Sequence, residues 1–163
     1  LDHLCRLTDS FGIFHFAKYS KPEKRYGYSL DDNARALIVA AKRYQSDPKP
    51  ETLKLIQTYL NFIKFAERPT GSFANVISYQ RHKDGTSDED VQGRAIWSLG
   101  FASSCQHSPE DTRKKADAMF HRALNQLIHV KSPRAIAFAI AGIYYNLQVH
   151  RHRHLDATRH DRL

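Results

Sequence analysis

The chain of 163 residues predicts an all-α protein built of antiparallel helical hairpins, and three observations support this fold class. A phrase at residues 27–37, Gly-Tyr-Ser-Leu-Asp-Asp-Asn-Ala-Arg-Ala-Leu, returns in looser form at residues 86–96. Apolar residues recur with helical spacing through most of the chain, and helix-start signals of Ser, Asp and Pro recur between the apolar segments. Such self-similarity is typical of a stacked supersecondary unit.

The two copies of the phrase align position by position. The coinciding pairs are Asp31 with Asp90, Asn33 with Gln92, Arg35 with Arg94, and Ala36 with Ala95. A weaker third copy, Ser132-Pro133-Arg134-Ala135-Ile136, places Arg134 where the second copy has Arg94. We therefore expect the phrase to stand at the start of one helix in each hairpin.

The N-terminal residues predict one short helix and an extended connector. Leu4 and Leu7 have helical spacing, and Asp9 follows as a stop. Residues 11–17 alternate in part between apolar and polar side chains, which allows a short strand, but no partner strand is evident. The polar residues 18–25 continue the connector.

The first hairpin follows the first copy of the phrase. Residues 32–44 predict a helix that is apolar on almost every side, which is typical of a buried inner helix. Ser29 and the acids at the helix start suit its exposed amides and its dipole. The prolines at 48 and 50 break this helix, and residues 51–67 carry a single apolar stripe, which predicts an amphipathic outer helix.

The second copy begins another hairpin. Residues 73–79 predict a short strand or an extended loop, and residues 89–103 predict a second inner helix. Ser108 and Pro109 precede two acids and open a second outer helix that runs to about residue 128. A third inner helix is expected over residues 134–149. The predicted order is therefore inner, outer, inner, outer, inner.

Composition narrows the possible classes of protein. The chain is 41% hydrophobic and 26% charged, which is ordinary for a globular protein, and residues 1–149 are expected to form one domain followed by a polar, basic tail at 150–163. No apolar run approaches the roughly 20 residues of a membrane span. The absence of an initiator Met or a signal peptide suggests a fragment or a processed chain.

The two cysteines fit neither a disulfide framework nor a metal site, so we expect free thiols, a cytoplasmic location, and neither metal nor cofactor. His150 and His154 are four residues apart, but no His-Glu-x-x-His arrangement accompanies them. The formal charge of +8 is spread over the predicted helix surfaces and loops without a nucleic-acid-binding signature. A solvated basic surface is therefore expected rather than a nucleic-acid partner.

Three stretches, residues 4–13, 27–37 and 71–100, resemble a bacterial family with an (α/α) helical-toroid domain of the six-hairpin glycosidase type. The resemblance spans residues 3–101. It implies about half of a toroid, because a complete ring needs about twice this length, and it implies a carbohydrate context, because such domains often accompany glycosyltransferases. The glycine-rich nucleotide site of those enzymes is absent, so sugar-transfer activity is not carried over. A second half-ring or a homodimer would be needed to enclose a sugar.

The repeated acids provide the candidate site. If the inner helices line a cavity about 8–10 Å apart, their starts share one rim, and Asp32 and Asp90 would approach the carboxylate separation of about 6.5–9.5 Å that an inverting glycosidase uses. These two residues are therefore the candidate acid and base. The candidate ligand-binding residues around them are Tyr28, Asp31, Asn33, Arg35, Tyr79, Glu89, Gln92, Arg94 and Trp97.

Helix capping and surface ion pairs are the alternative interpretation of the same acids. Asp31 and Arg35 are four residues apart, as are Asp90 and Arg94, and each pair can bridge on one helix. We expect carbohydrate recognition as an accessory domain, with an inverting glycoside hydrolase as the first alternative. The second alternative is a helical-repeat scaffold that binds a protein or an acidic polymer. An exposed apolar edge on the last helix would favour the scaffold, at Ile136, Phe138, Ile140, Ile143 and Tyr144.

Overall fold

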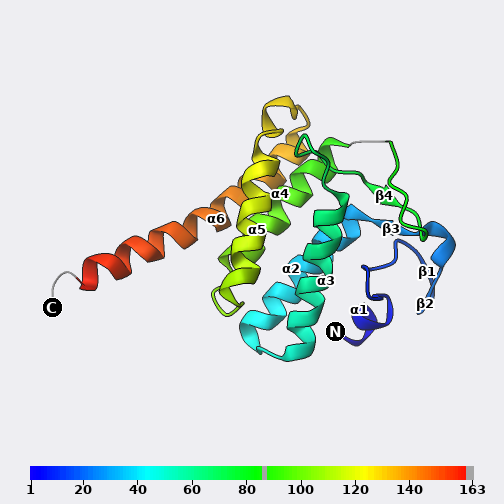
Figure 1. Cartoon of the computed structure of the whole chain (residues 1–163), viewed down its shortest axis with the longest axis horizontal. Coiled ribbons are helices and arrows are strands. Elements are labelled where there is room, and N and C mark those ends of the chain that lie inside the picture. The colour runs from blue at the N-terminus through cyan, green and yellow to red at the C-terminus, as the bar shows by residue number, and fades with distance from the viewer. Residues whose placement is uncertain (86–87, 161–163) are drawn as a thin grey trace.

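The computed structural model describes the backbone of residues 1–85 and 88–160, and the side-chain surroundings of residues 1–85 and 88–148. Within these ranges the chain is mostly helical, which confirms the predicted fold class at that level (Figure 1). The helices are α1 Asp2–Arg6, α2 Leu30–Ser46, α3 Pro50–Ala66, α4 Glu89–Ser104, α5 Glu110–Leu124 and α6 Pro133–His160. The strands are β1 Ala17–Lys18, β2 Lys21–Pro22, β3 Tyr28–Ser29 and β4 Val76–Ile77, with 3-10 turns at Lys24–Tyr26 and Leu127–His129.

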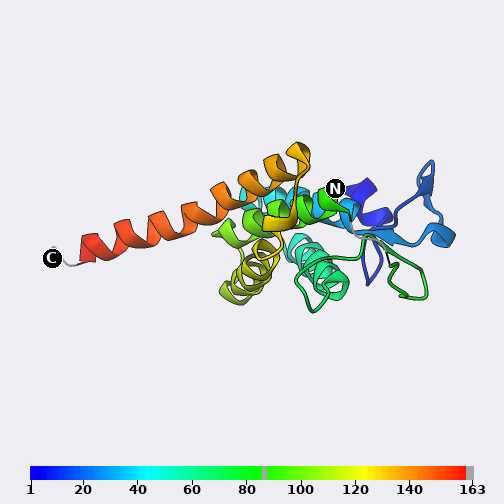
Figure 2. The ribbon, with the colours of Figure 1, turned by 90° about the horizontal axis from the view of Figure 1, so that it is seen from above.

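The long helices form two layers. Figure 2 shows α2, α4 and α6 side by side, with α3 and α5 beneath them. Helix α2 packs against α3 and α4, and α4 packs against α5 and α6. The predicted alternation of helices is therefore present, and the three helices that begin with copies of the repeated phrase share one layer.

Helix α2 illustrates how the sequence builds this layer. Ser29 caps it, because its hydroxyl accepts a hydrogen bond from the Asp32 amide at 3.1 Å, and acids follow in the first turn. Its buried residues lie on several sides, and Leu37, Ala40 and Ala41 are fully inaccessible. Helix α3 starts with Pro50 and buries a single face that includes Ile56, as predicted for an outer helix.

Helices α4 and α6 approach each other closely at glycines. A Cβ built on Gly100 would lie 2.1 Å from the Gly142 carbonyl oxygen, and one built on Gly93 would lie 2.4 Å from the Ala135 carbonyl oxygen. Because no side chain separates the two backbones at these points, the helices form the most extensive contact between elements of the fold.

The connectors contain two small sheets that the sequence did not pair. β1 and β2 form a hairpin, and β3 pairs antiparallel with β4, with Tyr28 opposite Ile77. The second pairing brings the connector before α2 against the loop before α4. Beside it, the ring of Tyr28 packs among Phe11, Phe14 and Phe62.

The last helix is longer than predicted. α6 continues to His160 and projects away from the two layers (Figure 1). Its backbone therefore crosses the boundary predicted at residue 150, and residues 161–163 of the predicted tail lie outside the described range. Among the described residues, no helix has both the length and the apolar character that a membrane span requires. Both cysteines are free; Cys105 is buried and Cys5 is exposed.

Candidate rim site

A cavity of about 270 Å³ lies where α2, α4 and α6 begin. It is lined by His15, Ser29, Asp31, Asn75, Val76, Asp88, Asp90, Val91, Arg94 and Arg134. Both copies of the repeated phrase contribute acids to this rim cavity, and the third copy contributes Arg134. The pairing of β3 with β4 supplies Ser29 and Val76, so the connector and the helix starts build the site together.

Ion pairs link the helix starts from one copy of the phrase to the next. Asp31 pairs with Arg35 on its own helix at 2.8 Å and makes a close contact with Arg94 of α4. Asp90 in turn pairs with Arg134 of α6. The predicted pair of Asp31 with Arg35 is confirmed.

Arg94 reaches across to α2 instead of pairing with Asp90 on its own helix. Its guanidinium carbon also lies 4.4 Å from the centre of the Phe138 ring. The repeated acids therefore connect neighbouring helices as well as beginning them.

Asp32 occupies a different environment from Asp31. Its carboxylate accepts hydrogen bonds from Ser29 at 2.5 Å and Arg35 at 2.6 Å, and it contacts His15 Nδ1 at 2.7 Å. Burial alone would raise the pKa of Asp32, but the hydrogen bonds from Ser29, His15 and Arg35 outweigh it and lower the pKa below the usual 3.8. Such a carboxyl stays ionised and is a poor proton donor.

Asp32 and Asp90 line different cavities. Asp32 lines a neighbouring cavity of about 300 Å³ with apolar residues such as Leu7 and Val39. His15 lines both cavities. Asp31, rather than Asp32, is the acid of the first copy that shares a cavity with Asp90.

The side-chain amides of Asn33 and Gln92 form hydrogen bonds with backbone groups. The buried Asn33 accepts from the Ile13 amide at 2.9 Å and donates to the carbonyls of Ile13 and Ser29. Gln92 donates to the Gly71 and Ala123 carbonyls, at 3.2 and 2.9 Å. Both predicted ligand-binding residues thus fasten a helix start to neighbouring segments, and neither lines the rim cavity.

The predicted aromatic residues also lie apart from the cavity lining. Tyr28 is buried and donates to Asp9 at 2.6 Å; burial and this bond raise the pKa of Tyr28 above its usual value. Trp97 is half-buried and stacks on Phe138 with an interplanar angle of 4°. Tyr79 is exposed and stacks on Phe14.

Glu89 acts at the start of the next helix in its layer. Its carboxylate accepts from the Lys131 and Ser132 amides at 2.7 and 2.5 Å, just before α6 begins. Glu89, on α4, therefore caps the start of another helix, α6. The sequence predicts capping for the repeated aspartates but not for Glu89. Of the predicted ligand-binding set, Asp31 and Arg94 line the rim cavity together with Asp90.

Asn75 and Arg134 complete the cavity. Asn75 Oδ1 is buried without a hydrogen-bond partner among the described residues, and the Asn75 carbonyl accepts from the Leu30 amide at 2.8 Å. The pairing of β3 with β4 places Asn75 at the cavity, and no local sequence pattern predicts this position. Arg134, by contrast, was identifiable because it aligns with Arg35 and Arg94 in the repeat.

The cavity therefore offers carboxylates, guanidinium groups, an amide and an imidazole within a small volume. Such groups can accept and donate hydrogen bonds to a hydroxyl-rich molecule. No group of three or more His, Cys, Asp or Glu side chains arranged to hold a metal ion occurs in the described part of the chain. The side chains of His150 and His154 lie outside that part.

No protein-family model matches this chain, and no curated protein matches it either.

Proposed function

We propose that this chain is a carbohydrate-recognition domain whose binding site is the rim cavity. The supporting observation is that two copies of the repeated phrase deliver Asp31 and Asp90 to one cavity, which Arg94 and Asn75 also line. Alternating acceptors and donors suit neighbouring sugar hydroxyls, because each hydroxyl can both donate and accept. A volume of about 270 Å³ is just below the usual range of about 300–1,000 Å³ for small-molecule sites, which fits a single sugar ring.

The two-layer arrangement supports the same proposal. Helices α2, α4 and α6 share one layer and α3 and α5 the other (Figure 2), and we assign them as the inner and outer helices of about half an (α/α) toroid of the six-hairpin glycosidase type. On this assignment, the starts of the inner helices form the rim that would face the sugar. The rim cavity lies at the corresponding end of this layer.

An inverting glycoside hydrolase is the enzymatic version of this proposal. It needs one carboxyl that carries a proton and one carboxylate that activates water. Asp31 and Asp90 are the pair that shares the cavity, whereas the lowered pKa of Asp32 makes that residue unsuitable as the acid. Because arginines contact both Asp31 and Asp90, recognition without hydrolysis is the better supported version.

A thermal-shift screen against mono- and oligosaccharides tests the recognition site. We expect a saturable rise in melting temperature with one class of sugar, equivalent to about 2.7 kcal/mol at a ligand concentration of 100 Kd. The Asp90→Asn variant should lose this response, whereas Asp111→Asn, an exposed acid in the first turn of α5, should keep it. Circular dichroism checks that both variants are folded. Flat responses from the folded wild-type protein would refute the sugar site.

The exposed face of α6 favours a second function, a helical-repeat scaffold. Ile136, Ile140, Tyr144 and Leu147 are 37%, 61%, 59% and 57% exposed. The predicted edge residues Phe138 and Ile143 are instead partly buried. The exposed apolar edge that would favour a scaffold is therefore present.

The repeat indicates which partner could pack against the exposed face of α6. In α4, Ile96 and Gly100 face α6, because the Ile96 carbonyl lies against Gly142 and Gly100 lies against the same residue. Ile136 and Ile140 take the equivalent positions in α6. We propose for this second function that a second copy of the chain docks on α6 and continues the layer.

A further inference from the structure

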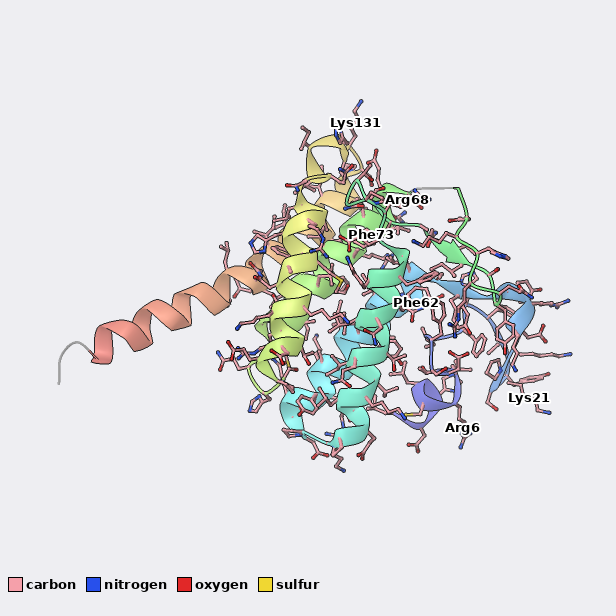
Figure 3. All side chains as sticks on the ribbon, in the orientation of Figure 1. Arg6, Lys21, Phe62, Arg68, Phe73 and Lys131 are labelled. Carbon is pink, nitrogen blue, oxygen red and sulfur yellow. The ribbon has the colours of Figure 1, made fainter. Side chains whose placement is uncertain are left out.

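The connectors form a strongly basic lobe at the end of the molecule opposite the projecting part of α6 (Figures 1 and 3). We define the basic lobe as residues 16–26 and 78–83, two segments joined through the pairing of β3 with β4. Its exposed cations are Lys18, Lys21, Lys24, Arg25, Arg81 and Lys83. Although the two segments are distant in the sequence, the pairing of β3 with β4 and the contact of Lys24 with Tyr79 bring them together.

Aromatic rings position four of these cations. Lys24 Nζ lies 5.1 Å from the centre of the Tyr79 ring, and the Arg25 guanidinium carbon lies 4.7 Å from that of Tyr26. Arg81 and Lys83 lie in the same way over Phe11 and Phe65, at 4.8 and 4.9 Å. A cation held over a ring keeps its full charge and has already lost part of its side-chain freedom, so less entropy is lost when an anion binds.

The lobe offers few acids to neutralise these charges. Among the ion pairs of the described residues, Arg25 is the one of the six cations with an acidic partner, Glu23 at 3.0 Å. Lys83 additionally approaches the Glu67 backbone carbonyl. The remaining cations face solvent, and their positive potential is available to an external anion.

The lobe also adjoins the rim cavity. His15, which lines the cavity, directly precedes the first lobe segment, and Val76 and Ile77 lead from the cavity into the second. The lobe segments thus begin at residues beside the cavity, within reach of a linear polymer that has one unit in the cavity. This continuity links the charge of the lobe to the ligand of the cavity.

We propose that the basic lobe binds an anionic polysaccharide whose sugar units carry carboxylates, and that the bound chain extends from the rim cavity over the lobe. This inference rests on the proposed carbohydrate function and names the class of sugar polymer. Stacked nucleic-acid bases need free ring faces. Among the lobe tyrosines, Tyr79 already contacts Phe14 and Lys24, and Tyr26 contacts Phe16 and Arg25, whereas Tyr19 is 90% exposed. A single-stranded nucleic acid is therefore the competing ligand that the test compares directly.

Binding of polygalacturonate, compared with its fully methyl-esterified form, tests the proposal. The two polymers share one backbone and differ in charge. By isothermal titration calorimetry we expect the wild-type protein to bind the charged polymer at least tenfold more tightly, with an affinity that falls as salt rises. The lobe variant Lys21→Gln/Lys24→Gln/Lys83→Gln should lose about tenfold in affinity for polygalacturonate, which corresponds to about 1.4 kcal/mol.

A matched variant controls for overall charge. Lys42→Gln/Lys54→Gln/Lys115→Gln removes the same charge from exposed positions on α2, α3 and α5, and it should bind within about twofold of wild type. Equal losses in both variants would overturn the lobe as a site. Tighter wild-type binding of a single-stranded oligothymidylate than of polygalacturonate would also overturn the proposal and assign the lobe to nucleic acid.

The outcomes separate this inference from the proposed function. If both polymers bind equally and Asp90→Asn abolishes both, the cavity binds sugar and the lobe proposal fails. If polygalacturonate binding depends on the lobe lysines and is unaffected by Asp90→Asn, the lobe binds the polymer and the cavity does not. Failure of polygalacturonate to bind at low salt overturns the lobe proposal outright.

Discussion

Asn33 and Gln92 occupy one position of the repeated phrase, and each fastens the start of its helix to neighbouring backbone. A buried amide can satisfy several backbone groups at once, which an apolar side chain cannot. The repeat therefore preserves a structural contact at this position. The carboxylates of Asp31 and Asp90 line the rim cavity. The repeated phrase therefore fastens the helix starts through its amide residues and builds the cavity through its acids.

Replacement of Asn33 tests whether its buried amide stabilises the fold. Asn33→Ala removes the side-chain partner of the Ile13 amide and of the Ile13 carbonyl, while the Ser29 carbonyl keeps its intrahelical bond as the N-cap of α2. Because each buried unsatisfied group costs about 1–3 kcal/mol, we expect the free energy of unfolding to fall by about 3 kcal/mol in urea denaturation. Asn61→Ala, at an exposed position of α3, should change it by less than about 0.5 kcal/mol. Equal effects would show that Asn33 contributes no more than a surface residue.

The acids show what the sequence predicted at this scale. The repeat correctly indicated that copies of the phrase begin neighbouring helices, and that Asp31 bridges to Arg35. It did not indicate that Arg94 would reach Asp31 on another helix, because the choice between two acids depends on the distance and rotation between helices. The sequence also offered no means of predicting that Asn75 lines the cavity, because its position follows from a strand pairing between segments that are distant in the sequence.

Glycines determine how helices α4 and α6 pack. Gly100 and Gly142 face each other, so the two backbones approach without intervening side chains. In the first copy of the repeat, Ala41 aligns with Gly100, and there α2 faces the end of α4: the Cys105 thiol lies 3.8 Å from the Ala41 carbonyl. Each successive pair of helices thus uses small residues at the same point of contact.

Gly100→Ala should separate α4 from α6. The new Cβ would lie 2.1 Å from the Gly142 carbonyl oxygen, which belongs to the backbone and cannot rotate away. Overpacking of this kind costs about 1–3 kcal/mol, and we expect the upper end, measured as the fall in unfolding free energy in urea. Gly85→Ala has no atom within 4 Å of its new Cβ and should change stability by less than about 0.5 kcal/mol. A neutral Gly100→Ala would contradict the close approach.

The helices were predictable as elements, whereas for the strands the sequence offered the expectation of a short strand or extended loop at residues 73–79, where β4 lies, but no pairing. Each long helix repeats its apolar pattern over several turns, and the observed bounds of α2, α3 and α4 fall within about two residues of the predicted ones. Strands β3 and β4 contain two residues each, which is too short to show any periodicity. The end of the last helix was also missed, because the polar composition after residue 149 indicated a tail.

At the scale of the whole molecule, α2, α4 and α6 follow one another in one layer. Each helix packs against the next through the equivalent face. Leu37 of α2 and Ile96 of α4 take equivalent positions in the repeat and are fully buried. Ile136 takes that position in α6 and is 37% exposed. The layer therefore stops at a face that is built like the faces the preceding helices use for packing.

Self-association of the chain follows if a second copy covers this face. We expect the mass measured by light scattering after gel filtration to rise toward that of a dimer as the protein concentration rises. Ile140→Glu should keep the protein monomeric, because a dimer would bury the new charge. Ile128→Glu is the matched control: Ile128 is 80% exposed on the turn Leu127–His129, outside the face, and this variant should associate like wild type. A wild-type protein that stays monomeric at every concentration would exclude a second copy as the occupant and leave the rim cavity and the basic lobe as the binding surfaces of the molecule.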